Sequence, residues 1–243
     1  MAARRSSTLG YTISMCGRYA LAAPRSHLCH RFGLDQCAEY SARYNIAPGT
    51  DIAVIRQSSA GRRVLDLLRW GLRPHWAQKS AATAVRPINA RGESLSEKPT
   101  FRDSFRHRRC LIPASGFYEW QVATGSGKAR TRQPWYVSLQ SGETMAFGGL
   151  WQSWTAPSGE IIGTCCIVTT AANPRVNAIH ERMPLILAPA HWQDWLTAEA
   201  DLARELIRPY PAAEIQLWPV SRRVGRVAED DPELMQALSG EWS

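Results

Sequence analysis

The 243-residue sequence contains very little lysine and no long hydrophobic segment. Its 29 basic residues include lysine only at Lys79, Lys98 and Lys128. Arginine suits bidentate recognition of phosphate, although a GC-rich genome would produce the same bias. No apolar run approaches the ~18 residues of a membrane span, and residues 1–14 lack the apolar stretch of a secretory signal. We therefore expect an intracellular protein without a membrane partner.

The cysteines follow no recognisable pattern. They are Cys16, Cys29, Cys37, Cys110, Cys165 and Cys166. This scatter fits neither a disulfide framework nor a zinc site, because no C-x-x-C pair occurs, and most of them are expected to be small buried side chains. The cluster His27-x-Cys29-His30 has no second ligand pair. We predict no metal and no other cofactor.

Positive charge is in excess. The formal net charge is +8 and the isoelectric point is near 9.5, and only Arg4 and Arg5 among the basic residues fall within residues 1–14. Clustered arginine gains affinity for polyanions by releasing counterions from phosphates. The basic character belongs to the main part of the chain and indicates a polyanionic partner.

Short apolar runs of strand length recur along the chain and are separated by Gly, Pro, Asn and Ser. They cover residues 52–55, 64–68, 110–112, 135–139, 145–151, 161–170, 185–187 and 215–220. Helical patterns are fewer: Leu28 and Phe32 after Pro24, a stripe from Trp192 through Trp195 and Leu196 to Leu202 and Leu206, and a short segment at 232–238. We predict a single α+β domain of mostly antiparallel, curled sheet with short surrounding helices.

Four polar stretches carry groups that a purely structural chain does not need. They are Cys16-Gly17-Arg18-Tyr19, Asn89-Ala90-Arg91-Gly92-Glu93, Gly116-Phe117-Tyr118-Glu119-Trp120 and His180-Glu181-Arg182-Met183-Pro184. Together they supply a nucleophile, an amide, guanidiniums and two proton-transfer groups. Each also has a structural interpretation.

Those structural interpretations stay open for each residue. Glu119 in an alternating strand would face solvent, and His180 would be a solvated loop residue. Asn89 would complete a turn, and Cys16 would be a core cysteine. The order and combination of the four stretches are more specific than any one of them.

In that combination the chain resembles the SRAP family, the SOS-response-associated peptidases or abasic-site-processing proteins. The resemblance is carried by MCGRY at residues 15–19, Trp70-Gly71-Leu72 with Pro74-His75-Trp76, Asn89-Ala90-Arg91-x-Glu93, Pro113-x-x-Gly116-Phe117-Tyr118-Glu119-Trp120 and His180-x-Arg182-Met183-Pro184. It implies a single-domain pseudo-barrel over residues 15–243. Only the preamble, residues 1–14, departs from the family pattern.

The resemblance also implies site residues and a partner. Catalytic positions are Cys16, Asn89, Glu119 and His180. DNA-binding positions are Arg18, Trp70, Trp76, Arg91 and Arg182. The implied partner is single-stranded DNA, or a junction of single and double strands, that contains an abasic site. We expect a monomer, in the cytoplasm near the nucleoid in a bacterium or in the nucleus of a eukaryote.

In this family the initiator methionine is removed, which would leave Cys16 with a free α-amine. The amine attacks the ring-opened aldehyde of an abasic sugar and the thiol closes a thiazolidine, giving a DNA–protein crosslink. An α-amine has a pKa of ~7.7–8.0, against ~10.4 for lysine, so more of it is unprotonated near neutral pH. Glu119 and His180 would move protons, and Asn89 would hold the amine or a sugar oxygen.

The flanking arginines would grip phosphates, and Trp70 and Trp76 would stack on bases unless they belong to the core. The run of basic residues at Arg102 and 106–109 would extend the phosphate track or form a solvated face.

The preamble leaves three accounts open: a misassigned start with Met15 as the true one, a leader removed before Cys16, or a retained tail. Two other functions also remain, a cysteine peptidase that uses Cys16 with His180 and a non-catalytic single-strand DNA-binding module.

Overall fold

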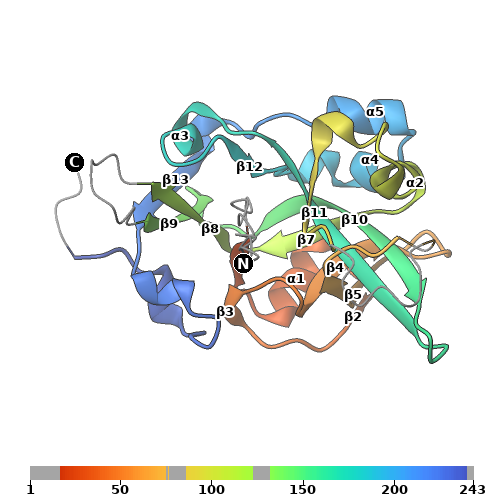
Figure 1. Cartoon of the computed structure of the whole chain (residues 1–243), viewed down its shortest axis with the longest axis horizontal. Coiled ribbons are helices and arrows are strands. Elements are labelled where there is room, and N and C mark those ends of the chain that lie inside the picture. The colour runs from red at the N-terminus through yellow and green to blue at the C-terminus, as the bar shows by residue number, and fades with distance from the viewer. Residues whose placement is uncertain (1–16, 75, 77–85, 123–131, 240–243) are drawn as a thin grey trace, which may run out of the picture.

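Five strands form a closed ring at the centre of the computed structural model, which describes residues 17–74, 76, 86–122 and 132–239 (Figure 1). Around the ring they are β11 (Ile161–Ala171), β10 (Met145–Thr155), β7 (Arg109–Ala114), β4 (Asp51–Gln57) and β5 (Arg63–Trp70). Neighbours are antiparallel except where β5 returns to β11 in parallel, with Thr164 opposite Arg69 and Cys165 opposite Trp70. This last pairing closes the barrel.

A second sheet of five strands lies beside the barrel. Its order is β13 (Ile215–Pro219), β9 (Arg132–Leu139), β8 (Gly116–Val122), β1 (Arg18–Leu21) and β3 (Arg43–Ile46). All of its pairings are antiparallel. Strand β8 follows β7 after a single residue, Ser115, so the chain passes directly from the barrel into this sheet.

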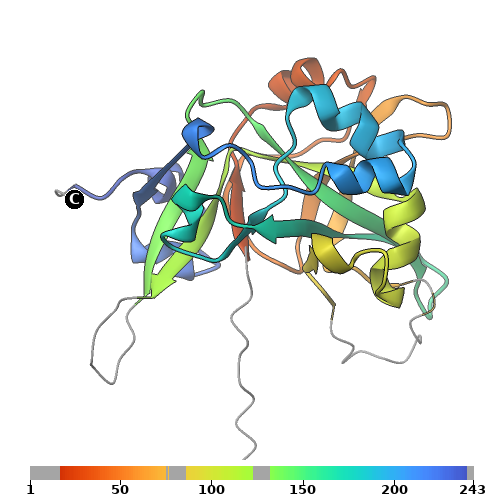
Figure 2. The same ribbon diagram turned by 90° about the horizontal axis from the view of Figure 1, so that it is seen from above.

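Three short strands extend the barrel sheet: β12 (Arg182–Pro184) and β6 (Asn89–Arg91) pair with β11, and β2 (Gln36–Cys37) pairs with β5. The α-helices are α1 (Arg25–Phe32), α2 (Pro99–His107), α3 (Pro174–Asn177), α4 (Trp192–Thr197) and α5 (Ala200–Glu205). Short 3-10 turns lie at Gly92–Ser94, Pro189–His191, Ala212–Glu214, Arg222–Gly225 and Pro232–Met235. Figure 2 shows α2, α4 and α5 gathered at the barrel end of the molecule, away from β9 and β13.

The two faces of the second sheet are buried against different partners. Phe117 and Tyr19 point into the main core with the barrel residues, and Tyr19 packs edge-on against Trp70 and Phe147 with ring centroids 5.4 and 6.1 Å apart. Tyr118 points the other way, into a small cluster beneath the C-terminal segment. The predicted α+β fold with curled, mostly antiparallel sheets is confirmed.

Most predicted elements are confirmed, with four differences. The helix predicted at 232–238 is only a 3-10 turn, Pro232–Met235. Residues 185–187 do not form a strand, because β12 ends at Pro184 and only Ile186 makes an isolated bridge, to Phe147. The stripe from Trp192 to Leu206 is two helices, since α4 ends where Ala198 becomes extended. Helix α2 was not predicted from its basic sequence; it has Pro99 in its first turn and buries Phe101 and Phe105.

The cysteines differ in one respect from expectation. Cys110, Cys165 and Cys166 are buried free thiols, as predicted, and burial raises the pKa of each. Cys29 and Cys37 form a disulfide, so the prediction that most cysteines are buried apolar side chains is wrong for this pair. The disulfide joins α1 to β2.

None of the described helices is long and apolar enough to cross a membrane.

Candidate active site

The amino-terminal end of β1 meets the strand that carries Glu119. Strand β1 pairs with β8 so that Arg18 lies opposite Tyr118 and Tyr19 opposite Phe117. Continued by one residue, this antiparallel register sets Gly17 opposite Glu119. Cys16 lies outside the described residues, but it is bonded to Gly17. The covalent neighbour of Cys16 therefore enters the fold beside this carboxylate.

Glu119 is a buried carboxylate. Its relative exposure is 3%, so the interpretation of a solvent-facing strand residue is wrong. On β8 it shares a face with Phe117, which lies in the main core, while Tyr118 and Trp120 face the smaller cluster. Burying a carboxylate is costly and rare without a specific reason, so this position favours the functional interpretation.

The loop that carries His180 contacts β8 on the same face. Gln121, two residues after Glu119, donates from Nε2 to the carbonyl of Ala178 at 3.2 Å. The Gln121 Oε1 accepts a hydrogen bond from Trp135 Nε1 at 3.1 Å. His180 lies two residues beyond Ala178 and is half-buried. The structure thus brings Glu119 and the His180 loop to one side of β8.

The His180 ring is fixed through one nitrogen. Its Nδ1 lies 3.1 Å from both the amide nitrogen and the carbonyl oxygen of Arg182. The Nε2 is consequently the nitrogen turned away from the backbone, and it is the one suited to exchanging a proton with a substrate.

Strand β6 places Asn89 and Arg91 beside strand β11 of the barrel. It runs parallel to β11, with Asn89 opposite Ile167 and Arg91 opposite Thr169. The Asn89 side chain is half-buried, whereas Arg91 is exposed. Alternation along the strand directs both side chains to the same face of the sheet.

Arg182 is engaged within the protein. Its guanidinium donates to both carboxylate oxygens of Glu93, from Nη1 at 2.5 Å and from Nη2 at 2.9 Å, and also to the Thr169 carbonyl at 2.9 Å. The hydrogen bond from Arg182 lowers the pKa of Glu93. Arg182 therefore links β12 to the turn after β6, and this is the role its contacts favour over gripping a phosphate.

The two tryptophans take different positions. Trp70 is fully buried and its Nε1 donates to the Ile88 carbonyl at 2.8 Å. A base has no access to its ring, so the core alternative is correct for Trp70. Trp76 is 59% exposed and keeps a face that a base could contact.

Arg18 is held by the C-terminal segment. Its Nη1 donates to Asn45 Oδ1 at 2.8 Å and to the Val224 carbonyl at 2.7 Å, and its Nη2 lies 3.3 Å from the Gly225 carbonyl. Burial lowers the pKa of this guanidinium. Three of the five N–H groups of Arg18 thus point into the protein, which favours a role in positioning β1 over a role in binding DNA.

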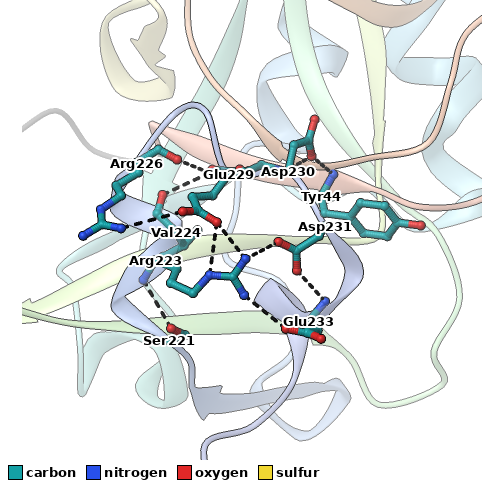
Figure 3. A network of polar contacts seen from close by, with 10 residues as sticks. Tyr44, Ser221, Arg223, Val224, Arg226, Glu229, Asp230, Asp231 and Glu233 are labelled. Atoms are coloured by element: carbon teal, nitrogen blue, oxygen red, sulfur yellow. Dashed lines mark hydrogen bonds and ion pairs between the residues drawn. The ribbon is translucent and has the colours of Figure 1, made fainter.

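The segment that receives Arg18 is organised by its own ionic network, the C-terminal clamp, residues 221–233 (Figure 3). Arg223 donates to Glu229 at 2.7 Å, to Asp231 at 2.5 Å and to Glu233 at 3.1 Å. Asp230 accepts from the backbone nitrogens of Tyr44 and Asn45 in β3. None of these residues was predicted from the sequence.

The basic run near α2 divides into two kinds of residue. Arg109 is buried and donates to the carbonyls of Phe105, Arg106, Trp195 and Ala198, so it ties α2 to α4 and belongs to neither predicted alternative. Arg108 pairs with Asp103. Arg102 and Arg106 are exposed and remain available to the predicted phosphate track.

Among the residues described, no three His, Cys, Asp or Glu side chains gather as a metal site would require.

Comparison with known proteins shows the family to which the chain belongs. The family model described as "SOS response associated peptidase (SRAP)" matches residues 15–227. The abasic site processing protein YoqW of Bacillus subtilis is 37% identical over 229 residues, covering 92% of this chain and all of YoqW. HMCES of Xenopus tropicalis, also called an abasic site processing protein, is 27% identical over 82% of this chain and 67% of its own length.

Solved structures agree. A Bacteroides thetaiotaomicron protein has a TM-score of 0.81 at 22% identity, over 92% of this chain and all of the other, which shows the shared fold. A Bordetella bronchiseptica protein has a TM-score of 0.74 at 26% identity, over 85% of this chain and all of that protein. The chain belongs to the SOS response associated peptidase (SRAP) family.

Proposed function

We propose that this protein processes abasic sites in DNA and captures them covalently through an amino-terminal Cys16. The observation that carries the proposal is the β1–β8 register, which sets Gly17 opposite the buried Glu119. The similarity to proteins named for abasic site processing supports the substrate class.

The proposed reaction uses two groups of Cys16, its α-amine and its thiol. The α-amine of Cys16 adds to the C1′ aldehyde of the opened sugar, and loss of water gives an imine. The thiol then adds to the imine carbon and the proton returns to nitrogen, closing a thiazolidine. One water leaves overall, and no oxidant or reductant is needed.

Glu119 and His180 supply the proton transfers in this scheme. A carboxylate beside the amine takes up the proton released as nitrogen attacks, and an imidazole Nε2 protonates the departing hydroxyl. Asn89, on β6 of the barrel sheet, positions a sugar oxygen or the amine in this scheme. Each role requires that the free amine exist, so the preamble must be absent or removed in the active protein.

The DNA partner follows from charge and exposure. Arg91, on β6 with Asn89, and Trp76 are exposed, and they provide a phosphate contact and a stacking surface. An abasic nucleotide has no base to read, so recognition depends on backbone and shape. Single strands and junctions can present such a nucleotide without unpairing a duplex.

The direct test uses protein that begins at Cys16, verified by intact mass, and an oligonucleotide with one abasic site. We expect a denaturation-resistant product whose mass equals protein plus DNA minus one water. Cys16→Ala should abolish it, and Glu119→Gln and His180→Gln should slow its formation at least tenfold. The exposed Glu97 and His30 provide matched controls as Glu97→Gln and His30→Gln. Absence of any product with verified amino-terminal Cys16 would refute the proposal.

A peptidase that uses the Cys16 thiol is the second candidate, favoured by the name of the matching family. The two differ in their need for the amine. Cleavage through a thiolate would survive a blocked amine, whereas the thiazolidine cannot form without a free one. A protein with residues 1–15 retained, confirmed by mass, therefore separates them: it should lose crosslinking, and turnover of a peptide by it would support the peptidase.

A further inference from the structure

A pocket lined by three arginines lies at one end of the β4–β5 hairpin. It has a volume of about 280 Å³ and is lined by Asp51, Arg69, Arg73, Arg86, Trp154 and Glu160, among others. Its walls come from the adjacent ends of β4 and β5, from the β10–β11 hairpin, and from the segments that follow β5 and precede β6. Three guanidiniums therefore border one cavity.

Arg73 is held rigidly at this pocket. Its backbone nitrogen donates to Thr164 Oγ1 at 3.0 Å, and Thr164 Oγ1 in turn donates to the Gln152 carbonyl at 3.2 Å. Its guanidinium carbon lies 3.3 Å from the centroid of the Trp154 ring. Only 6% of Arg73 is exposed. A guanidinium fixed in this way loses little conformational entropy when an anion binds.

Arg86 stands next to Arg73 because the backbones of their segments are paired. Leu72 donates to the Pro87 carbonyl at 2.9 Å, and an added Cβ on Gly71 would lie 3.3 Å from the Cβ of Arg86. Arg86 is exposed. Burial lowers the pKa of Arg73, and the positive charge of Arg86 lowers it further. The two cations repel each other, and an anion between them would relieve that repulsion.

Three arginines and two acidic residues line the pocket, so its lining carries a formal net charge of +1. Asp51 is occupied by Arg69, whose Nε lies 2.6 Å from Asp51 Oδ1 and whose Nη2 lies 3.4 Å from Oδ2. Glu160 is exposed, in the turn that joins β10 to β11. Arg86 is thus the exposed guanidinium that an incoming anion would meet, with Arg73 lining the same pocket.

We propose that Arg73 and Arg86 bind a phosphate of the DNA strand that flanks the abasic nucleotide. The assignment rests on the proposed function. Arg86 precedes Asn89 by three residues, so their Cα atoms lie at most ~10 Å apart. A phosphate bound at Arg86 would thus belong to a nucleotide close to the abasic site. Planar guanidiniums are well matched to phosphate oxygens, and backbone contacts of this kind set register without reading sequence.

The test measures equilibrium binding of an abasic single strand in a Cys16→Ala background, where covalent capture cannot occur. We expect Arg86→Ala to weaken binding about tenfold and to reduce the slope of log affinity against log salt by about 0.7, the value for one phosphate on a single strand. The matched control is Arg62→Ala, because Arg62 is also exposed but lies at the opposite end of the β4–β5 hairpin. A slope unchanged by Arg86→Ala, or reduced equally by Arg62→Ala, would overturn the assignment.

Neutral methylphosphonates placed one at a time in the oligonucleotide then locate the phosphate. One position close to the abasic site should weaken binding to the protein that retains Arg86 and have no further effect on Arg86→Ala. Equal effects in both proteins at every position would contradict the proposal. Failure here leaves crosslinking by Cys16 intact, and failure of crosslinking leaves the salt slopes measurable, so the two proposals are tested separately.

Discussion

The replacement Asn45→Ala should destabilise this protein more than any exposed substitution, because Asn45 joins three parts of the chain. Its side chain is almost fully buried, with 1% exposure. Its Nδ2 lies 3.1, 3.0 and 2.8 Å from the carbonyls of Val224, Arg226 and Glu229, and its Oδ1 accepts from Arg18. Together with the Arg18 guanidinium, which also bonds the Val224 carbonyl, the Asn45 amide therefore connects β1, β3 and the C-terminal clamp.

The magnitude follows from these bonds. The amide has two protons, so it contributes about two net hydrogen bonds at ~1 kcal/mol each, and the bond from the Arg18 guanidinium adds ~1.5–3 kcal/mol. The loss in free energy of unfolding should therefore be about 3–5 kcal/mol. Urea unfolding followed by tryptophan fluorescence measures it. The exposed Asn177→Ala is the control and should change stability by no more than ~0.5 kcal/mol.

A second substitution at the same position checks the direction of the hydrogen bonds. Asn45→Asp keeps an acceptor for Arg18 but turns a carboxylate oxygen toward three carbonyls, which raises the pKa of that carboxyl. A raised folded-state pKa means that the variant regains stability as pH falls and the protonated form donates. A loss below ~1 kcal/mol for Asn45→Ala, or no recovery of Asn45→Asp on acidification, would refute the role of Asn45.

Three further predictions concern other parts of the fold. The pKa of Glu93 is lowered by Arg182, so the ion pair stabilises the protein above the ordinary pKa of Glu and loses this contribution as pH falls through the lowered value. In thermal unfolding, Glu93→Gln should therefore be less stable than the parent protein at pH 7, and the difference in stability should be smaller near pH 3. An equal difference at both pH values would contradict this prediction. A Cβ on Gly116 would lie 2.4 Å from Tyr136 Cζ and 2.6 Å from the Val137 carbonyl, so Gly116→Ala should cost about 2 kcal/mol or more by urea unfolding, and a neutral effect would show that β8 and β9 can separate. Iodoacetamide at pH 8 should alkylate Cys110, Cys165 and Cys166 only after unfolding, because burial keeps them as thiols, and peptide mass mapping of native protein would detect any exception.

The barrel strands could be predicted from the sequence because they are buried on both faces or on one, which leaves continuous or alternating apolar runs. The strands that carry the site could not be predicted equally well. Strands β6 and β12 have three residues each, too few for any periodicity, and they exist because β11 offers them a partner. Such pairings connect residues far apart in sequence and leave no local signal.

The side-chain environments were harder still. Trp70 and Trp76 are the same residue type six positions apart, and one is fully buried while the other is 59% exposed. Arg18 lies in a motif that invites a phosphate-binding interpretation, yet its partners are Asn45 and carbonyls more than 200 residues away. The sequence could suggest candidate residues, whereas only the fold distinguishes those that are held inside the protein from those that face solvent.

A nucleophile at a chain terminus poses a physical problem, because terminal residues normally fray. Here β1 lies between β8 and β3, so the strand that follows Gly17 is paired on both edges. Its alternating side chains are held as well: Tyr19 is buried against Trp70, and Arg18 is bound by Asn45 and the clamp. Two anchors immediately after Gly17 limit how far a reactive residue joined to it can move. In the proposed reaction, Arg18 and Tyr19 would contribute to capture by raising the effective concentration of the Cys16 amine beside Glu119. Weakening either anchor should then slow crosslinking without altering its product.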